Sequence, residues 1–464
     1  MNKGTMEGIR PLEQWIEKMM AHYEAAGLAV AVVDKNVTLY QKFFGFRDAE
    51  NQTPIDENTI FGLASVSKSF TALSIMQLAE KGVIDLGGPV SRYLPEFQNA
   101  HAAQPVTVAH LLSHAGGFLP KRRMLVEEVA RDLGIWQDGK AEIGPHPGLA
   151  MEGCRRVCKG LDEEEARTGL PGEYMSYSND SYGLLSEIIR RYGGENSFQD
   201  YLEKNVFAPL EMDRATGLFI APAQDPNSTK LYFHKDGKRQ WCRDYYDNAF
   251  VLMGGGAVKA SLGSMKKYVQ MYLNEGKGEH GRLLSPYGIR EMMKPRQHYR
   301  YGQWYGYGVA MSELEGVRMV GHGGGMTGIS SHFAWSPELE AGVVVLCNTS
   351  GVPVSRVAEE ALRWVTGAAV PAPMKNWQDA GWSEEEKKSC LGKFRNAEGN
   401  EATFTWENGD LHLTMGGKER EFIMAGHDLI ILPGEFSQSD ILLLREEGRG
   451  VWGVRTGGRI LTRQ

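Results

Sequence analysis

The chain has 464 residues, of which 42% are hydrophobic and 23% charged, a composition typical of a globular protein with enough apolar material for a large core. Its length exceeds the usual size of a single domain and favours two domains. The net charge of −7, with no long basic run to offset it, argues against nucleic acid as the main partner.

The N-terminal residues lack the apolar stretch of a secretory signal, and no apolar run reaches the length of a membrane span. We therefore expect a cytoplasmic protein with no membrane partner. The five cysteines are scattered and odd in number, which is typical of reduced thiols. Cys154 and Cys158 are four residues apart, but no further cysteine or histidine pair completes a zinc site, so we expect no bound metal.

The chain opens with the pattern of an amphipathic helix at residues 6–26, followed by a strand hairpin at residues 28–33 and 37–46. Residues 65–81 then have the apolar spacing of a buried helix, with Ser65 and Lys68 at its start. Side chains three positions apart lie on one face of a helix, so these two can touch.

Contact between Ser65 and Lys68 would let the lysine amine take the hydroxyl proton and make the serine a nucleophile. The N-terminal end of a helix also presents unpaired N–H groups and a partial positive charge, which suit an oxygen that becomes negative during acyl transfer. Taken alone, the pattern is weak, because a helix-capping serine followed by a solvated lysine is more frequent.

The middle of the chain predicts a short helix at residues 106–117, closed by glycines. His110 and His114 within it are four residues apart, and with no acidic ligand near in sequence we interpret them as buried or capping residues. Residues 121–168 are irregular and mixed in charge, so they are either a solvated surface excursion or a lid over the site. Further helices are predicted at residues 181–192, 197–210, 261–274 and 353–366, and strands at 309–320, 330–335 and 342–348.

The composition changes near the C-terminus. Residues 367–373 are small and proline-containing, and short alternating strands follow from about residue 384, with Asn408 and Gly409 as a hairpin turn. We predict a first domain at residues 1–366, a linker at 367–383 and a small β-barrel accessory domain at 384–464. The first domain has strand pairs near both ends and helices between them, which predicts an α+β fold with an antiparallel sheet flanked by helices.

Three motifs follow one another along the chain: Ser65-x-x-Lys68, Tyr177-x-Asn179 and His322-x-Gly324. Together with the stretches around them, they resemble the serine β-lactamase and penicillin-binding-protein superfamily over roughly residues 10–366. The resemblance is to the branch that contains class C β-lactamases, D-aminopeptidases, alkyl-D-Ala-type carboxypeptidases and β-lactamase-like esterases. The C-terminal part is similar to the lipocalin-like domains appended to some members of this branch.

The resemblance implies that Ser65 is the acylated nucleophile and that Lys68 is its hydrogen-bonded partner and proton acceptor. It implies that Tyr177 is a general base and acid, and that Asn179 holds Lys68 and the substrate amide. A tyrosine has an ordinary pKa of about 10, and two cationic neighbours would be needed to lower it, of which Lys68 is one. Whether Tyr177 or Lys68 is the base stays open.

His322 departs from the pattern, because β-lactamases and many penicillin-binding proteins carry lysine there. A histidine is neutral or charged near pH 7 and would grip a substrate carboxylate less firmly than lysine at alkaline pH. The glycines that follow, Gly324 among them, let the strand approach the substrate closely. The resemblance implies that the N–H groups of Ser65 and Gly325 form an oxyanion hole.

We therefore expect a serine hydrolase that acts through a covalent acyl-enzyme on amide or peptide bonds of small substrates; D-residues in them are implied by the resemblance alone. No metal or organic cofactor is expected. A carboxylesterase of the same fold is the first alternative. A β-lactamase, a peptide ligase or cyclase that transfers the acyl group to an amine, and a sensor acylated without turnover are the others. The expected partner is a small-molecule or peptide substrate, and a homo-oligomer stays open.

Overall fold

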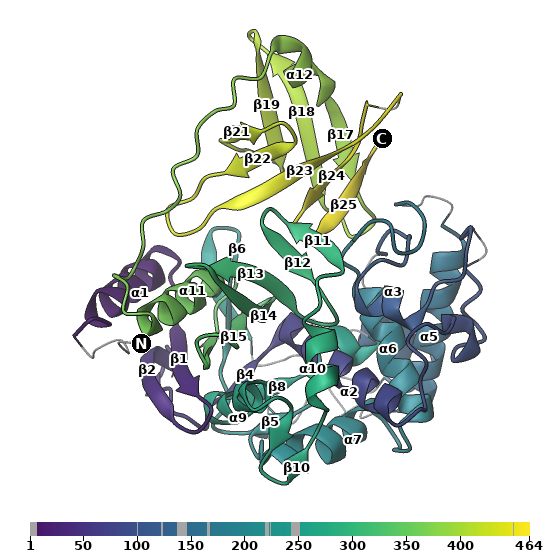
Figure 1. Ribbon diagram of the computed structural model, residues 1–464, viewed down its shortest axis with the longest axis vertical. Helices are drawn as coiled ribbons and strands as arrows, with labels where there is room; N and C mark the ends of the chain where they lie inside the picture. The colour runs from purple at the N-terminus through teal and green to yellow at the C-terminus, as the bar shows by residue number, and fades with distance from the viewer. Residues whose placement is uncertain are drawn as a thin grey trace.

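The computed structural model describes residues 7–99, 101–121, 124–136, 146–164, 168–218, 222, 224–242, 251–448 and 450–464. Two antiparallel sheets of nine strands organise it. One runs through the body of the molecule, which also carries most of the helices, and the other forms a smaller unit that stands on the body (Figure 1). This arrangement confirms the predicted α+β fold.

The body sheet is assembled from both ends of the body, as predicted. Strand β1 (Gly27–Asp34) pairs with β16 (Ala341–Cys347), with Leu28 opposite Cys347. The sheet order is β11-β12-β13-β14-β15-β16-β1-β2-β3. The other strands are β2 (Thr38–Asp48), β3 (Thr53–Pro54), β11 (Gln297–Arg300), β12 (Gln303–Tyr305), β13 (Ala310–Leu314), β14 (Val317–Met326) and β15 (Ile329–Ser336).

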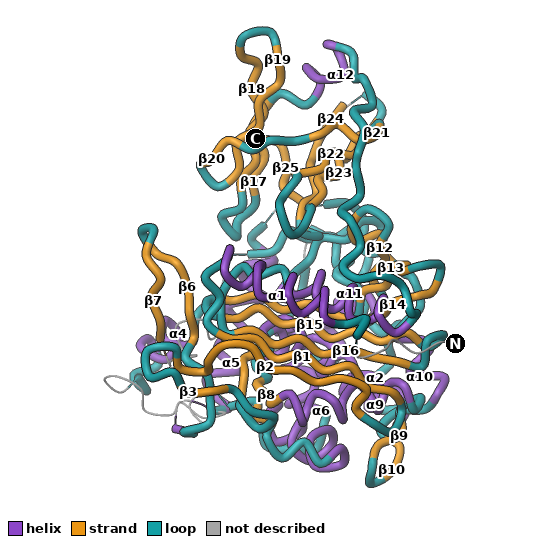
Figure 2. Tube along the Cα trace, turned by 90° about the vertical axis from the view of Figure 1, so that its left-hand side faces the viewer, coloured by secondary structure: helices purple, strands orange, loops and turns teal. Residues whose placement is uncertain are grey.

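Both faces of this sheet are covered by helices, which explains why β1 is apolar and buried from Gly27 to Val33. Successive side chains of a strand point to opposite faces. Figure 2 shows α1 (Arg10–His22) and α11 (Val354–Val365) on one side of the sheet, and α2 (Ser67–Glu80), α6 (Asn179–Tyr192) and α9 (Leu262–Leu273) on the other. Leu28, Val30 and Val32 pack with the first group, and Ala29, Ala31 and Val33 with the second.

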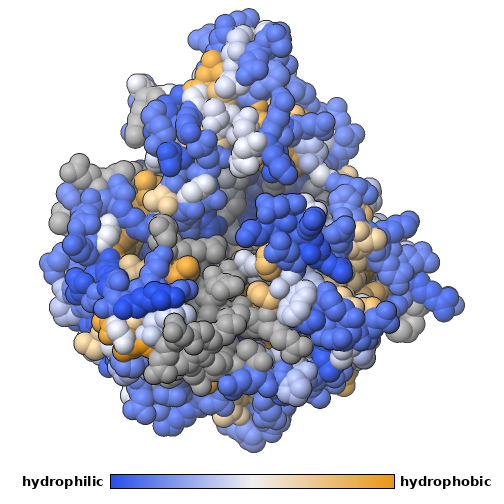
Figure 3. Space-filling view, turned by 180° about the vertical axis from the view of Figure 1, so that it is seen from behind, coloured by the Kyte–Doolittle hydropathy of each residue, from blue (hydrophilic) through white to orange (hydrophobic). Residues whose placement is uncertain are grey.

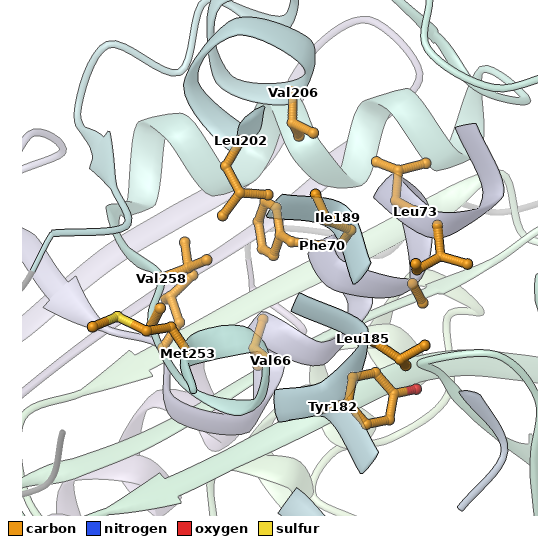
Figure 4. Close-up of a cluster of buried hydrophobic side chains, with 14 of the residues drawn as sticks. Val66, Phe70, Leu73, Tyr182, Leu185, Ile189, Leu202, Val206, Met253 and Val258 are labelled. Carbon is orange, nitrogen blue, oxygen red and sulfur yellow. The ribbon is translucent and has the colours of Figure 1, made fainter. Parts of the chain in front are cut away.

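Helix α2 lies at the centre of the body. Its residues from Ser67 to Leu78 are all buried, as expected for a helix surrounded by protein. The 3-10 turn η1 (Ala64–Val66) precedes it and carries Ser65, so the predicted helix begins as a tighter turn. In Figure 4, Val66, Phe70 and Leu73 pack among side chains from α6, α7 (Phe198–Leu202) and the turn η6 (Met253–Gly255).

The sequence predicted an irregular segment at residues 121–168, and this prediction is wrong for much of its described part. Its described part contains α4 (Val126–Asp132) and α5 (Pro147–Asp162), and α5 buries an apolar stripe in the core. The interpretation as a solvated excursion is therefore wrong for α5, whose apolar residues recur at helical spacing between charged ones. Residues 122–123, 137–145 and 165–167 lie outside the described part, and a lid function stays a prediction.

Two turns between strands differ in how well the local sequence predicts them. Asn408 and Gly409 both have positive φ and join two strands, as predicted. Glu315 and Gly316 do the same between β13 and β14, where the sequence predicted one continuous strand. Glutamate is an uncommon residue at such a φ, so its turn carried no recognisable signal.

The remaining elements of the body are short. The helix α10 was not predicted, and helix α1 is shorter than predicted. The elements are η2 (Val90–Arg92), α3 (Val108–Leu112), η3 (Glu203–Phe207), η4 (Ala208–Leu210), α10 (Pro286–Met292), β4 (Ile60–Gly62), β5 (Ala215–Thr216), β6 (Leu231–Lys235), β7 (Lys238–Cys242), β8 (Lys259–Ser261), β9 (Lys277–Gly278) and β10 (Gly281–Arg282).

The C-terminal sheet curls into a half-barrel around its own apolar core, in the order β20-β19-β18-β17-β25-β24-β23-β22-β21. We call the residues from β17 to β25 the half-barrel. A short helix, α12 (Glu384–Ser389), precedes it. Its strands are β17 (Gly392–Arg395), β18 (Glu401–Glu407), β19 (Asp410–Met415), β20 (Lys418–Glu419), β21 (Ile423–Gly426), β22 (Leu429–Leu432), β23 (Ser439–Glu446), β24 (Gly450–Thr456) and β25 (Arg459–Arg463).

The described surface in Figure 3 is mostly hydrophilic, with small separate apolar patches. No helix in the described ranges is both long and apolar enough to cross a membrane. None of the five cysteines, all of which lie in the described ranges, is part of a disulfide in the structure.

Strand β14 passes close to the turn that carries Ser65, and a glycine permits this approach. A Cβ atom at Gly324 would overlap the Leu63 carbonyl oxygen and the Ser331 hydroxyl. We expect Gly324→Ala to lower the free energy of unfolding by about 2 kcal/mol or more, because the backbone of one segment must move. Urea unfolding followed by circular dichroism measures this change.

Gly325→Ala is the matched control, since a Cβ atom at Gly325 meets no atom of the described residues within 4 Å. It should change the free energy of unfolding by less than about 1 kcal/mol. Equal losses in the two variants would show that the close approach at Gly324 is not what makes a glycine necessary there.

Candidate active site

Ser65 lies on a turn that is held from two sides. Ala64, just before it, has a φ of +45°, a left-handed conformation that is uncommon for a residue with a side chain. Two hydrogen bonds pin the turn to the segment before β8: Leu63 N–H donates to the Val258 carbonyl at 3.0 Å, and Val258 N–H donates to Ser67 Oγ at 2.9 Å. Such local strain persists only where the surroundings enforce it, and it is frequent at functional sites.

Lys68 is fully buried beside Ser65. Its Nζ lies 3.1 Å from Ser65 Oγ and donates to Asn179 Oδ1 and to the Gly255 carbonyl, each at 2.9 Å. Both carbonyl oxygens can only accept, so they occupy two N–H groups of the amine. The third position of Nζ faces Ser65 Oγ, where an ammonium would donate a hydrogen bond and a neutral amine would present its lone pair.

Tyr177 is buried and faces the same two residues. Its ring centroid is 4.8 Å from Lys68 Nζ. Burial raises the pKa of Tyr177 above its ordinary value, against the lowering effects of the nearby Ser65 hydroxyl and the Arg459 charge. Tyr177 is therefore a protonated phenol at rest.

Asn179 begins helix α6 and connects Lys68 to the half-barrel. Ser178 caps this helix by accepting a hydrogen bond from Ser181 N–H, which fixes the start of α6. The Asn179 side chain accepts from Lys68 through Oδ1, and its Nδ2 lies 3.5 Å from Glu398 Oε1, beyond the end of β17.

His322 lies on β14, buried, with both ring nitrogens engaged. Nδ1 is 2.6 Å from the Gly323 carbonyl, which can only accept, so Nδ1 carries the hydrogen. Nε2 is 3.0 Å from the Tyr305 hydroxyl and accepts from it. Burial, together with the charge of Lys68, lowers the pKa of His322 to about 3. Of the two charge states that the sequence left open, the structure therefore selects the neutral one.

His114 was not predicted as part of the site, yet it supports Tyr177. Its Nδ1 accepts a hydrogen bond from Ser178 N–H at 3.1 Å, and its ring centroid is 4.2 Å from that of Tyr177. His110 caps helix α3 through a hydrogen bond from Thr107 N–H to its Nδ1. Both histidines therefore have the buried or capping roles that the sequence favoured.

The half-barrel also reaches the site, which no local pattern in the sequence indicated. Tyr177 N–H donates to the Gly458 carbonyl at 2.8 Å, and the Arg459 guanidinium lies 4.8 Å from the centroid of the Tyr177 ring. Arg459 Nε in turn donates to Glu398 Oε2 at 2.5 Å. The turn between β24 and β25 thus lies directly on a residue of the site, about 280 positions away in sequence.

Among the described residues, no group of three or more His, Cys, Asp or Glu side chains could hold a metal ion. Cys154 and Cys158 lie buried in α5 with their Sγ atoms 3.9 Å apart. The groups around Ser65 and Lys68 are an amine, a phenol and an amide, which come from Lys68, Tyr177 and Asn179.

The chain is similar to several known proteins. A protein-family model described as Beta-lactamase matches residues 12–368. Penicillin-binding protein 4* of Bacillus subtilis is 30% identical over 204 residues, 44% of this chain and 40% of that protein. A D-aminopeptidase of Brucella canis is 22% identical over 448 residues, 94% of this chain and 76% of that protein. A crystal structure of SurE is similar with a TM-score of 0.72 and 19% identity, covering 99% of both chains.

The chain spans only about half the length, or less, of the first curated relatives that it matches. The likeness to SurE, at 19% identity, shows the fold. The family model runs from within α1 to just beyond α11 and includes every residue of the site except those of the half-barrel. The chain therefore belongs to the beta-lactamase family.

Proposed function

We propose that this protein is a serine hydrolase that forms a covalent acyl-enzyme at Ser65 and cleaves amide or peptide bonds of small substrates, including those with D-residues. The observation that carries the proposal is the contact between Ser65 Oγ and Lys68 Nζ, whose other hydrogen bonds orient the amine toward the serine. The similarity to a D-aminopeptidase across 94% of this chain supports the substrate class.

In the proposed acylation step, Ser65 Oγ attacks the substrate carbonyl carbon, and its proton passes to Lys68. Lys68 is favoured as the acceptor because, as a neutral amine, it would present its lone pair to Ser65 Oγ. Tyr177 holds its proton at rest and is therefore suited to give it to the leaving nitrogen when the C–N bond breaks. Water then attacks the ester carbonyl of the acyl-enzyme and gives its proton to the Tyr177 phenolate. The ester C–O bond breaks, and Lys68 returns its proton to Ser65 Oγ as the acid product leaves.

The oxygen that becomes negative in these steps would accept hydrogen bonds from the N–H groups of Ser65 and Gly325. No atom of the described part of the chain lies within 4 Å of a Cβ atom at Gly325, which supports this assignment, since a substrate could approach the strand there. Gly324 has a different task in the proposal, because its missing side chain lets β14 lie against Leu63.

The half-barrel supports a preference for small substrates. Gly458 and Arg459 lie against Tyr177, and Glu398 lies beside Asn179, so the site is walled on this side. A long polymer could not continue past that wall, whereas the end of a short peptide or amide could stop there.

A carboxylesterase of the same mechanism is the second candidate. The neutral state of His322 favours it over a β-lactamase, because a neutral imidazole supplies no positive charge for a substrate carboxylate. Transfer of the acyl group to an amine, as in a ligase or cyclase, would use the same acyl-enzyme and differs only in the second nucleophile. Self-association stays a prediction, which the mass in solution would test.

We expect Ser65→Ala to abolish turnover of D- and L-amino acid amides, short peptides ending in D-residues, and p-nitrophenyl esters, because the acylated oxygen is removed. Turnover is measured on this panel, together with a chromogenic cephalosporin. Amide turnover with a preference for the D- or the L-enantiomer would support the peptidase, and turnover of esters alone would support the esterase.

Ser74→Ala is the matched control, since this serine lies on α2, directly after the turn that carries Ser65, and donates to the Phe70 carbonyl at 2.9 Å. Its activity should stay within about threefold of the wild type, because loss of one helix-internal hydrogen bond acts mainly on stability. Turnover that persists in Ser65→Ala would remove Ser65 from the mechanism, and stoichiometric acylation without turnover would make the protein a sensor.

His322 predicts how stability depends on pH. Its folded-state pKa of about 3 lies below the ordinary value of about 6.5, so the unfolded chain binds this proton first as the pH falls. The stabilising contribution of neutral His322 is therefore complete above about pH 6.5 and is lost as the pH falls toward 3, by up to about 1.4 kcal/mol per pH unit.

His322→Gln cannot titrate, so its free energy of unfolding should fall less steeply between pH 6.5 and 4 than that of the wild type. Urea unfolding at several pH values measures both slopes. His101→Gln, at an exposed position, is the control and should keep the slope of the wild type. An identical slope in His322→Gln would show that His322 is not held neutral by burial.

A further inference from the structure

The loop between β24 and β25 makes a specific contact with the site. Tyr177 N–H is bound to the Gly458 carbonyl, and Ile460 N–H donates to Ser176 Oγ at 3.3 Å, so hydrogen bonds on both sides of Arg459 hold it in place. Gly458 has a φ of +78° and lies against the Tyr299 ring, where a side chain would collide. The loop is therefore built to hold Arg459 over the Tyr177 ring.

Charged groups near Tyr177 come from several elements. Lys68 belongs to α2, and Arg300 belongs to β11, with its guanidinium 5.0 Å from the Tyr299 ring centroid. Arg459 and Glu398 come from the half-barrel and form an ion pair. The other titratable side chains that face Tyr177 are His114, Tyr182, Tyr299, Tyr305 and His322.

The two histidines in this group supply no charge near neutral pH, because burial lowers the pKa of both His114 and His322. If Tyr177 gives up a proton during the reaction, its phenolate must be stabilised by the cations that remain. Lys68 is one of them, on the side of Ser65, and Arg459 lies over the ring itself. Opposite charges at this separation in a buried site interact strongly because little water screens them.

We propose that the half-barrel supplies part of the electrostatics of the reaction. Arg459 acts as a positioning residue that stabilises the phenolate which Tyr177 forms when its proton passes from Oη to the leaving group. Glu398 holds the guanidinium in place and partly offsets its charge. The half-barrel is then a functional part of the hydrolase site, in addition to being its wall.

The proposal makes opposite predictions for the two members of the ion pair. Removing the cation in Arg459→Gln makes the phenolate less stable, so the limb of the pH profile of kcat/KM that Tyr177 controls should move to higher pH by about 1 unit. Removing the anion in Glu398→Gln leaves Arg459 unopposed, so the same limb should move to lower pH. The double variant should lie between them, and Arg459→Lys, which keeps a positive charge, should lie closer to the wild type than Arg459→Gln.

The profiles are measured between pH 7 and 12, because burial places the limb that Tyr177 controls above about pH 10. The substrate is D-alanine p-nitroanilide, or p-nitrophenyl acetate if the amide is not turned over, and the rate without enzyme is subtracted at each pH. Arg445→Gln is the control, because it breaks a different ion pair of the half-barrel, Arg445 with Asp428 at 2.6 Å. Its profile should coincide with that of the wild type. Thermal unfolding of each variant verifies folding, and if Arg459→Gln does not fold, the shift of Glu398→Gln to lower pH decides the test.

The proposal would be overturned if the pH profiles of Arg459→Gln and Glu398→Gln moved in the same direction. It would also be overturned if the rates fell without any change in the shape of the profile, since loss of packing alone produces such effects. This inference rests on the proposed function, and the two fail in different ways. Turnover by Ser65→Ala would remove the proposed function, whereas a Ser65-dependent enzyme with unmoved profiles would lose only the role of Arg459.

Discussion

The burial of Lys68 is the constraint on which the rest of the site depends. An amine removed from water is unfavourable by several kcal/mol unless oxygen atoms replace its lost hydration. The Ser65 hydroxyl, the Asn179 side chain and the Gly255 carbonyl replace it here, and they come from three separate segments. The start of α2, the start of α6 and the turn η6 must therefore keep one fixed arrangement, and the apolar packing around Phe70 enforces it.

The same burial decides the protonation of the neighbouring groups. It keeps the phenol of Tyr177 protonated and the imidazole of His322 neutral, so the centre of the site holds few charges. Each remaining charge acts at short range and with little screening. For this reason the Arg459–Glu398 pair bears directly on Tyr177, although it belongs to the other sheet. In the proposed function, the half-barrel and the body thus form one site.

Much of the fold could be predicted because its determinants are local. The apolar run of β1, the hairpin that follows it, the buried helix α2 and the Asn408–Gly409 turn all carry patterns that lie within about ten residues. The predictions of secondary structure were wrong where the local pattern was hard to recognise. The apolar stripe of α5 is interleaved with charged residues, and the turn at Glu315 lacks the residue types that usually form it.

For the site, the sequence by itself determined which chemical groups are present. It also determined that one pair is in contact, because Ser65 and Lys68 are three positions apart and therefore one helical turn from each other. Only the tertiary structure decided that His322 is neutral, that His114 supports Tyr177, and that Arg459 and Glu398 reach the site. The physical reason is that burial and charge–charge contact depend on residues brought together from distant parts of the chain. No pattern of neighbouring residues encodes how much water remains around a side chain once the two sheets have packed.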